Sequence, residues 1–273
     1  MTVPHVDYVS SCIGKMYAGH VIQVFEGAIN VLGDGPLWIL GPLKGPQPLG
    51  VRLNFLPELR NGDPVLRNDN ILRLGKNYEL DLKGAEIWST SSMSLNNIRE
   101  ETYNEVTQWA KRYSVQPDYI DALTSGNVYF HNLDGQVISR LREVIINAII
   151  GAGFKGAKEL IGLGTGLTPS GDDALVGMLA SLKGSDHFYM LGEKIKNNLK
   201  KTNWISQGYL QCAISGEFGW EASRVIRACT GTDDLEDSIR LASRVGNSSG
   251  SFFMLGFIGG LIIRLALLKS IHS

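Results

Sequence analysis

Cysteine is scarce in this chain and its histidines are scattered, which excludes several classes of protein. The three cysteines, Cys12, Cys212 and Cys229, are odd in number and widely spaced, so they form neither a CxxC pair nor a disulfide framework. The five histidines show no HxxxH or HExxH spacing, which argues against the common zinc sites. We therefore expect a cytoplasmic protein with reduced thiols.

Excess charge of one sign and long apolar runs are also missing. The 26 basic and 27 acidic residues give a net charge of −1, without the basic stripe that nucleic-acid binding requires. The N-terminus lacks the basic-then-apolar pattern of a signal peptide. The most apolar run, Phe252–Leu268, is interrupted by Arg264, and its uninterrupted part is shorter than the ~20 residues of a membrane span. We expect no nucleic-acid partner, no membrane span and a buried core helix at this run.

The first 95 residues predict a β-rich domain, because short runs of strand-forming residues alternate with turns. The predicted strands are His20–Phe25, Trp38–Leu40, Val51–Phe55, Ile71–Leu74 and Tyr78–Leu82. Gly75 and Asn77 favour a hairpin between the last two strands. Gly41–Gly50, with three prolines and three glycines, predicts a loop. Several short strands at close spacing favour a small barrel or sandwich.

From residue 96 the hydrophobic period becomes helical. The predicted helices are Ile98–Tyr113, Arg140–Ile150, Lys155–Ile161, Asp172–Leu182, Leu191–Lys200, Ile205–Ile214, Glu217–Thr230, Leu235–Val245 and Ser251–Lys269. Strands and helices do not alternate, which disfavours a Rossmann-type sheet. The sequence therefore predicts the α+β class, with a β-rich barrel or sandwich in residues 1–95 and an all-α domain in residues 96–273.

The segment Gly162–Asp173 combines four glycines, three hydroxyls and two carboxylates in twelve residues. Glycines let backbone N–H groups approach a ligand, and carboxylates accept or transfer protons. The structural alternative is a helix start, with Ser170 as the N-cap and Asp173 in a capping box. That alternative explains neither the second aspartate nor the run of glycines. We predict a binding role, with Asp172 and Asp173 as candidate catalytic residues and these candidate substrate-binding residues: Gly164, Thr165, Gly166, Thr168 and Ser170.

Three ligand arrangements fit a helix start that carries two carboxylates. An anion could sit on the backbone of residues 162–168, Mg²⁺ could bridge Asp172 or Asp173 to a phosphate, or the carboxylates could accept N–H groups of an amide or ureido ligand. The lysine of a Walker A loop is absent, and so is the spacing of a dinucleotide fingerprint.

Gly246–Gly250 is the second candidate turn, and it echoes the first. Ser170-Gly171 is followed six residues later by Gly177, and Ser249-Gly250 six residues later by Gly256. Each is a polar turn that leads into an apolar helix. If the two helix starts meet, they would enclose a polar pocket, to which Asn247, Ser248 and Ser249 would contribute as substrate-binding residues.

The core of the first segment, Gly164–Asp173 with Leu175 and Gly177 after it, resembles the signature of the AllH-type subunit of oxamate carbamoyltransferase. Supporting similarities are Val24-Phe25, Ala28–Asn30, Gly41-Pro42, Gly45-Pro46, and Gly246–Gly250 followed by Gly256. The resemblance implies a role in allantoin breakdown, where oxalurate and phosphate become oxamate and carbamoyl phosphate with two other subunits, one of them FdrA-like. It therefore implies a homo- or hetero-oligomer, and it adds Asn30 and Gly45 to the candidate substrate-binding residues.

The chain departs from that family's pattern at three positions. Gly27 stands where the family has arginine, Asn247 where it has histidine, and Phe252 where it has aspartate. The Ser-Thr-Arg-Thr phosphate motif of ordinary transcarbamoylases is absent. Three functions stay open: a carbamoyltransferase subunit, a non-catalytic binding or scaffold subunit (a divergent paralogue), and a stand-alone metal-dependent hydrolase or carboxylase.

Overall fold

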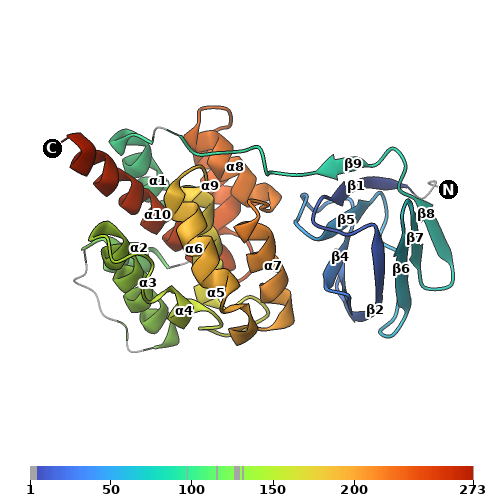
Figure 1. The fold of residues 1–273 in the computed structure, drawn as a ribbon. Helices are drawn as coiled ribbons and strands as arrows, with labels where there is room; N and C mark the ends of the chain where they lie inside the picture. Colours follow the sequence, from blue (N-terminus) through green and yellow to red (C-terminus); the bar gives the residue numbers. More distant parts are fainter. Residues whose placement is uncertain (1–4, 97, 115, 126–129, 131, 273) are drawn as a thin grey trace. The chain divides into compact units, whose positions relative to one another are not determined.

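The computed structural model describes residues 5–96, 98–114, 116–125, 130 and 132–272, which divide into two compact units. The β unit comprises the N-terminal residues up to Thr90 together with Glu217–Trp220, and the helical unit comprises Ser91–Gly216 and the chain from Glu221 onward. Figure 1 shows the strands in the blue to teal part of the chain and the helices in the remainder. The predicted α+β class is confirmed.

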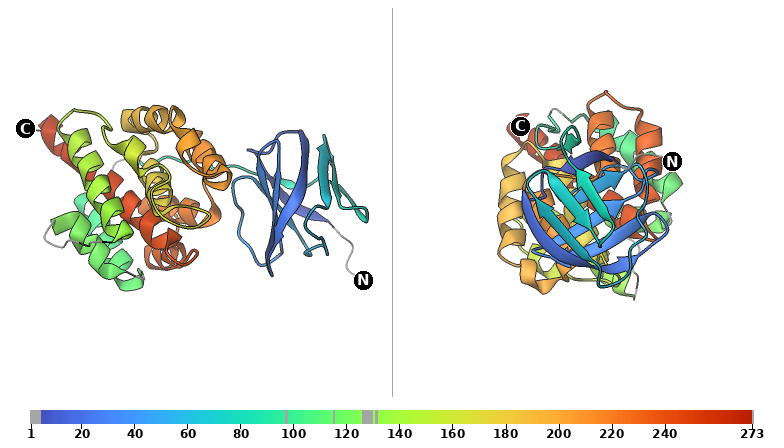
Figure 2. Two further views of the ribbon diagram at one scale, coloured as in Figure 1. Left: turned by 90° about the horizontal axis from the view of Figure 1, so that it is seen from below. Right: turned by 90° about the vertical axis from the view of Figure 1, so that its right-hand side faces the viewer.

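The β unit is one sheet that, in the residues described, has nine strands curled into a half-barrel (Figure 2). The strands are β1 (Val6–Ser10), β2 (Met16–Val24), β3 (Ala28–Gly33), β4 (Pro36–Leu40), β5 (Gly50–Leu53), β6 (Pro64–Asn68), β7 (Ile71–Leu74), β8 (Tyr78–Asp81) and β9 (Glu86–Trp88). Their order is β8-β7-β6-β2-β3-β4-β5-β1-β9, with β4–β5 and β1–β9 parallel. The five predicted strands are present with small shifts at their ends, whereas β1, β3, β6 and β9 are additional.

The concave core of the β unit follows the two-residue period of its strands. Ile29 and Val31 alternate along β3, and Leu37 and Ile39 alternate along β4; all four are at most 1% exposed. Each fully buried Leu, Ile or Val contributes about 1.5–3 kcal/mol relative to exposure. These four side chains belong to the hydrophobic core of the unit, and Asn30 and Trp38 on the other face of the same strands are buried as well.

Glu217 attaches a distant part of the chain to the β unit. Its carboxylate accepts hydrogen bonds from Ser11 Oγ (3.0 Å), Ser89 Oγ (2.6 Å), and Thr90 N and Oγ1 (2.6 and 3.3 Å). The predicted helix Glu217–Thr230 therefore starts later, because these bonds and that from Phe218 N to Thr90 Oγ1 hold its first residues in a non-helical conformation.

The helical unit is built around two apolar helices, α5 and α10. Its helices are α1 (Glu100–Tyr113), α2 (Pro117–Ser125), α3 (Leu133–Ile149), α4 (Ala157–Leu160), α5 (Ser170–Leu182), α6 (Asp186–Lys196), η1 (Leu199–Lys201), α7 (Trp204–Ile214), α8 (Trp220–Cys229), α9 (Leu235–Ser243) and α10 (Ser249–His272). In Figure 1, α10 runs among α1, α3, α5 and α9, and each of these packs against it. All nine predicted helices are present with shifted ends, and α2 is additional.

The long helix α10 is apolar because it lies in this core. By length and composition its stretch Ser249–Ser270 could cross a membrane, yet 67% of the most apolar window is buried by the rest of the chain. Its only arginine, Arg264, donates to the backbone oxygens of Ser181 (3.4 Å), Lys183 (3.3 Å) and Leu95. Burial lowers the pKa of Arg264. The guanidinium thus satisfies carbonyl groups at the C-terminal end of α5, where a cation is favoured.

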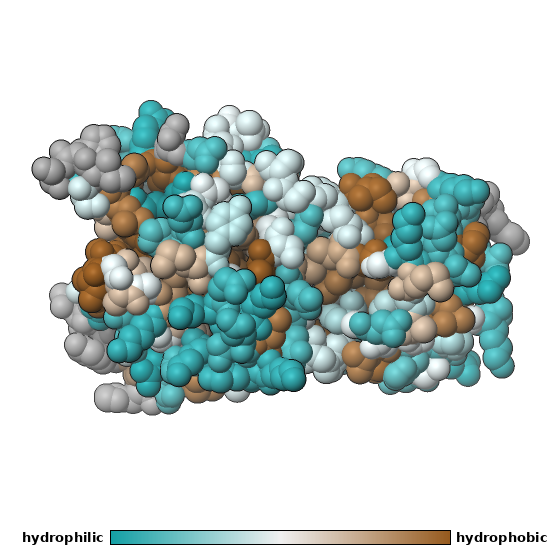
Figure 3. All heavy atoms as spheres, in the orientation of Figure 1, coloured by the Kyte–Doolittle hydropathy of each residue, from teal (hydrophilic) through white to brown (hydrophobic). Residues whose placement is uncertain are grey.

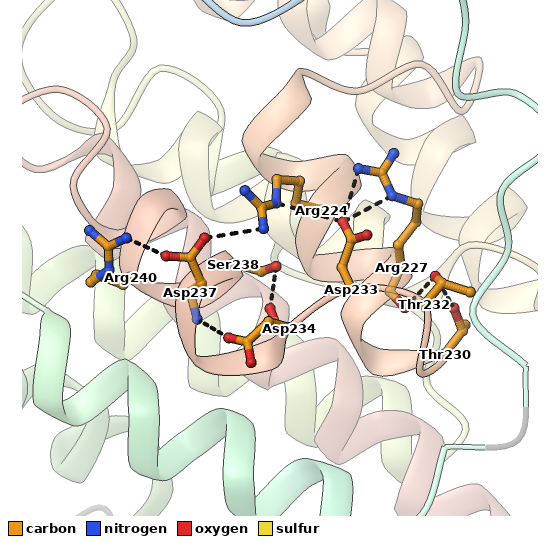
Figure 4. A network of polar contacts seen from close by, with 9 residues as sticks. All are labelled: Arg224, Arg227, Thr230, Thr232, Asp233, Asp234, Asp237, Ser238 and Arg240. Carbon is orange, nitrogen blue, oxygen red and sulfur yellow. Dashed lines mark hydrogen bonds and ion pairs between the residues drawn. The ribbon is translucent and has the colours of Figure 1, made fainter.

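A network of ion pairs fixes the corner between α8 and α9 (Figure 4). Arg227 Nη2 lies 2.9 Å from Asp233 Oδ2, and Arg224 Nη2 lies 3.1 Å from Asp237 Oδ2. Arg240 hydrogen-bonds Asp237, which lowers the pKa of that carboxyl. These ion pairs fix the start of α9 against α8. Helix α9 is followed by the turn that precedes α10.

Candidate functional site

Helices α5 and α10 cross in direct backbone contact at two glycines. A Cβ placed on Gly177 would lie 1.9 Å from the carbonyl oxygen of Phe253, and one on Gly256 would lie 1.8 Å from that of Ala174. No side chain fits at either position. Gly177 and Gly256 therefore allow the two helix axes to approach closely.

The crossing is locally symmetric, since each helix uses the same positions. Ala174 and Gly177 are four and seven residues after Ser170, the first residue of α5; Phe253 and Gly256 are four and seven after Ser249, the first of α10. The second residue is also glycine in both helices, and a Cβ there would meet a carbonyl oxygen of the preceding helix at 2.1 Å (Gly171 to Leu160) or 2.2 Å (Gly250 to Ala242). The chain thus contains two copies of one packing motif.

The N-terminal ends of the two helices meet, as their echo in the sequence predicts. Thr168 Oγ1, just before α5, lies 3.0 Å from Ser249 Oγ at the start of α10. The same Thr168 hydroxyl lies 3.4 Å from Asp173 Oδ2. Because the positive ends of both helix dipoles converge here, the junction favours negative charge.

Asp172 points away from solvent and anchors the loop. It is 1% exposed, its Oδ1 accepts Gly162 N (2.9 Å), and its Oδ2 accepts Thr202 Oγ1 (2.5 Å) and Ser206 Oγ (2.7 Å). Burial raises the pKa of Asp172, while the hydrogen bonds from Thr202, Ser206 and Gly162 lower it. With both oxygens engaged by protein donors, Asp172 anchors the loop, and its role as a catalytic residue stays a prediction.

Asp173 is the carboxyl that remains available to a ligand. It is half-buried and faces the hydroxyls of Thr168 and Ser249. Burial raises the pKa of Asp173 to about 7, with a smaller contribution in the same direction from Asp172, while hydrogen bonds from Ser249 and Thr168 lower it. A carboxyl with this pKa can both accept and donate a proton near neutrality.

The loop before α5 is exposed and held open by glycine. Thr165 and Gly166 are exposed, and a Cβ on Gly166 would meet no atom within 4 Å. Gly164 and Gly166 have φ values of 126° and 96°, which favour glycine. The backbone N–H groups of this loop are therefore accessible to a small ligand.

Ser170 is not the N-cap that the sequence predicts. The N-cap is Pro169, whose φ of −55° and ψ of 141° keep it extended, and it makes no side-chain cap hydrogen bond. Ser170 is the first helical residue, 5% exposed, and its side chain lies against Gly164. The proline shifts the helix start by one residue, because its fixed φ suits the approach to a helix.

Of the candidate residues in the second turn, the structure brings Ser249 to the same junction. Ser249 contacts Thr168, while Ser248 is half-buried and its carbonyl oxygen accepts Phe252 N (3.1 Å). Asn247 is exposed. Phe252, at the position equivalent to Asp173, is fully buried, and its ring centroid lies 5.8 Å from that of Tyr119.

The remaining candidates, Asn30 and Gly45, belong to the β unit. Asn30 is 5% exposed and pairs with Trp38 in the sheet. Gly45 packs on Trp220, since a Cβ on it would lie 3.0 Å from that side chain, and its carbonyl oxygen accepts Tyr8 Oη (3.5 Å). Both positions have a structural explanation, and their roles as ligand contacts stay predictions.

The residue set around Asp173 is not a typical metal site. Among the residues that the structure describes, no group of three or more His, Cys, Asp and Glu side chains is placed to hold a metal ion. The oxygens of Asp172 accept three protein hydrogen bonds, which leaves them poorly suited to coordinate Mg²⁺. Mg²⁺ bridging Asp172 and Asp173 therefore gains no support from the geometry.

Thr202 and Ser206 complete the site, and the sequence analysis missed them. They lie thirty or more residues after Asp172, in an unremarkable polar stretch at the start of α7. The only signal in the sequence is Asp172 itself, the aspartate that helix capping does not explain. If such a carboxylate is buried, it requires hydrogen-bond partners elsewhere in the chain.

The part of the chain that forms this junction matches a family model. Residues 160–261 match the family model described as oxamate carbamoyltransferase subunit AllH. This segment is of the AllH type. The AllH-type segment runs from the end of α4 into α10, so it includes both copies of the packing motif and the junction at Asp173. No solved structure matches the chain.

The raised pKa of Asp173 predicts a pH-dependent stability. The folded chain keeps the proton up to about pH 7, whereas the unfolded chain releases it near pH 4. The folded state therefore binds more protons between about pH 4 and 7, and stability falls as the pH rises through this window, by on the order of 2–3 kcal/mol. Urea unfolding at pH 5 and pH 8 measures the fall. Asp173→Asn should reduce it, and an unchanged pH dependence in this variant would contradict the assignment.

Proposed function

We propose that this chain is a subunit of an oxamate carbamoyltransferase-type enzyme of purine-ureide (allantoin and oxalurate) breakdown. It would bind a small anionic ureido or oxamate-like substrate, or carbamoyl phosphate, where α5 and α10 begin. The observation that carries the proposal is Asp173, a half-buried carboxyl whose pKa burial raises to about 7, at the meeting point of two helix N-termini within an AllH-type segment.

Recognition of an anion follows from the groups that converge on the junction. Two helix N-termini attract negative charge, and the loop at Thr165 and Gly166 presents accessible backbone N–H groups. The Thr168 and Ser249 hydroxyls can donate to a carboxylate or phosphate oxygen. Asp173 opposes an anion only when ionised, so its raised pKa reduces the conflict and leaves its proton available to the ligand.

The proposed reaction needs one proton transfer that Asp173 can perform. In phosphorolysis of oxalurate, a phosphate oxygen bonds to the carbamoyl carbon, the bond from that carbon to the amide nitrogen breaks, and the nitrogen gains the proton that phosphate loses. A group that takes the proton from phosphate and returns it to the leaving nitrogen is most effective with a pKa near the working pH. Partner subunits, one of them FdrA-like, would supply groups that this chain lacks.

A non-catalytic binding or scaffold subunit is the second candidate. At the position of α10 equivalent to Asp173, Phe252 packs on Tyr119, so the symmetric junction carries one carboxyl and not two. A chain that binds an anion without a second proton-transfer group would serve a partner's active site. Turnover by the isolated chain would exclude this second function.

Ligand-induced stabilisation tests the proposal. Millimolar oxalurate, oxamate or carbamoyl phosphate should raise the Tm by about 3–5 °C, as expected for a ligand at roughly ten times its Kd. Asp173→Asn and Thr168→Val should each reduce the shift by at least half. Asp186→Asn, an exposed aspartate in the first turn of α6, is the matched control and should keep the full shift. Absence of a shift with all three ligands would overturn the proposal.

A further inference from the structure

A cluster of lysines lies beside the loop that leads to Asp173. Residues 155–162 and 193–202 contain six lysines, all exposed, against two glutamates, although the whole chain has a net charge of −1. Figure 3 shows a broad hydrophilic area over the part of the helical unit where α6 and α7 lie. We call this set the lysine patch: Lys155, Lys158, Lys194, Lys196, Lys200 and Lys201.

Most of the patch is not neutralised by neighbouring carboxylates. Lys158 lies 3.5 Å from Glu159, and Lys196 lies 4.0 Å from Glu193. The other four lysines have no ion pair within the described part of the chain. Since the two pairs are exposed and weak, the patch keeps a net positive potential.

The patch is joined to the candidate site through backbone and side-chain contacts. Lys201 Nζ donates to the carbonyl oxygen of Lys158 (3.3 Å), which connects η1 to α4. A Cβ on Gly162, the first residue of the loop, would lie 2.5 Å from the carbonyl oxygen of Lys201. The next residue, Thr202, donates to Asp172. The positive surface therefore adjoins the Gly162–Asp173 loop.

We propose that the lysine patch collects small anions and raises their local concentration at the α5–α10 junction. The inference rests on the proposed function, because it assumes that the ligand is anionic. A field of this kind acts over about 10 Å at 0.1 M salt and over longer distances at low salt, and it acts more strongly on a doubly charged ligand than on a singly charged one. It accelerates association without any fixed contact to the ligand.

Three lysines that take no part in the site give the test. In Lys155→Gln/Lys194→Gln/Lys200→Gln, the Kd of carbamoyl phosphate should rise about five-fold at roughly 20 mM ionic strength, and that of oxamate about two-fold. Above roughly 0.3 M salt, both should approach the values of the unmodified chain. Isothermal titration calorimetry on the full chain measures both constants. The matched control, Lys15→Gln/Lys76→Gln/Lys83→Gln, removes the same charge from the β unit and should leave both constants unchanged.

The outcomes separate this inference from the proposed function. If the unmodified chain binds the anions and the patch variant binds them equally well at low salt, the inference is wrong and the proposed function stands. An equal loss in the β-unit control would also overturn it, since the effect would then belong to net charge. If the variant keeps its anion affinity but loses a co-purifying subunit, the patch is a protein-docking surface instead. Failure of the unmodified chain to bind either anion would overturn both proposals.

Discussion

Replacing Gly256 with alanine is expected to lower the free energy of unfolding by more than about 3 kcal/mol. The new methyl group would lie 1.8 Å from the Ala174 carbonyl oxygen, and a backbone atom cannot move aside without separating α5 from α10. Gly177→Ala should have an effect of similar size. The double variant should lose less than the sum, because both changes open the same contact. Urea unfolding followed by far-ultraviolet circular dichroism measures the three values.

Gly192→Ala is the control for this comparison. Gly192 also lies inside a helix, but a Cβ there would meet only Ile214 Cγ2, at 3.4 Å. Alanine is the better helix former, so this variant should be neutral or gain up to about 1 kcal/mol. If Gly256→Ala changed the free energy of unfolding as little as Gly192→Ala, the close backbone contact between α5 and α10 would be contradicted.

Asp172→Ala should cost about 3–5 kcal/mol. The change leaves Gly162 N, Thr202 Oγ1 and Ser206 Oγ without their acceptor in a site that excludes water. Thermal and urea unfolding measure the loss. The loop before α5 would lose its anchor as well, so any ligand response of this variant would fall together with stability.

Replacing single donors to Asp172 shows how much each hydrogen bond contributes to the loss of stability. Thr202→Val and Ser206→Ala each remove one bond to Asp172 and should cost about 1–2 kcal/mol. Asp172→Asn keeps the shape and part of the hydrogen bonding, so its cost should lie between these values and that of alanine. An Asp172→Ala variant as stable as the unmodified chain would show that the carboxylate is not the anchor.

The helices could be predicted from the sequence better than the strands. Helix α3 carries apolar residues at helical spacing, and α5, α7 and α10 carry apolar stretches longer than a typical strand, so their presence was predictable and only their ends differ in the structure. Strands β6 and β9 escaped prediction for local reasons: β6 begins with Pro64, and β9 is three residues long. Helix α2 also begins with a proline, Pro117, and its nine residues give too short a pattern to recognise.

The meeting of the two helix starts was predictable, but the different surroundings of the two aspartates were not. The repeated spacing from Ser170 to Gly177 and from Ser249 to Gly256 anticipated that two helix starts meet. The adjacent aspartates look alike in sequence, yet the helix turns one carboxyl inward and the other toward the junction. The buried carboxyl is the one that meets Thr202, just before α7, and Ser206, within it. A local sequence pattern does not reveal contacts between residues thirty or more positions apart.

The four hydrogen bonds accepted by Glu217 have a consequence for synthesis of the chain. The β unit draws on residues up to Thr90 and on Glu217–Trp220, so the ribosome must make the whole segment between them before the unit has all its parts. Until then Ser89 and Thr90 lack the carboxylate that they bond in the finished protein. Although domains often fold in order of synthesis, the first-made unit of this chain is completed only after most of the helices have left the ribosome.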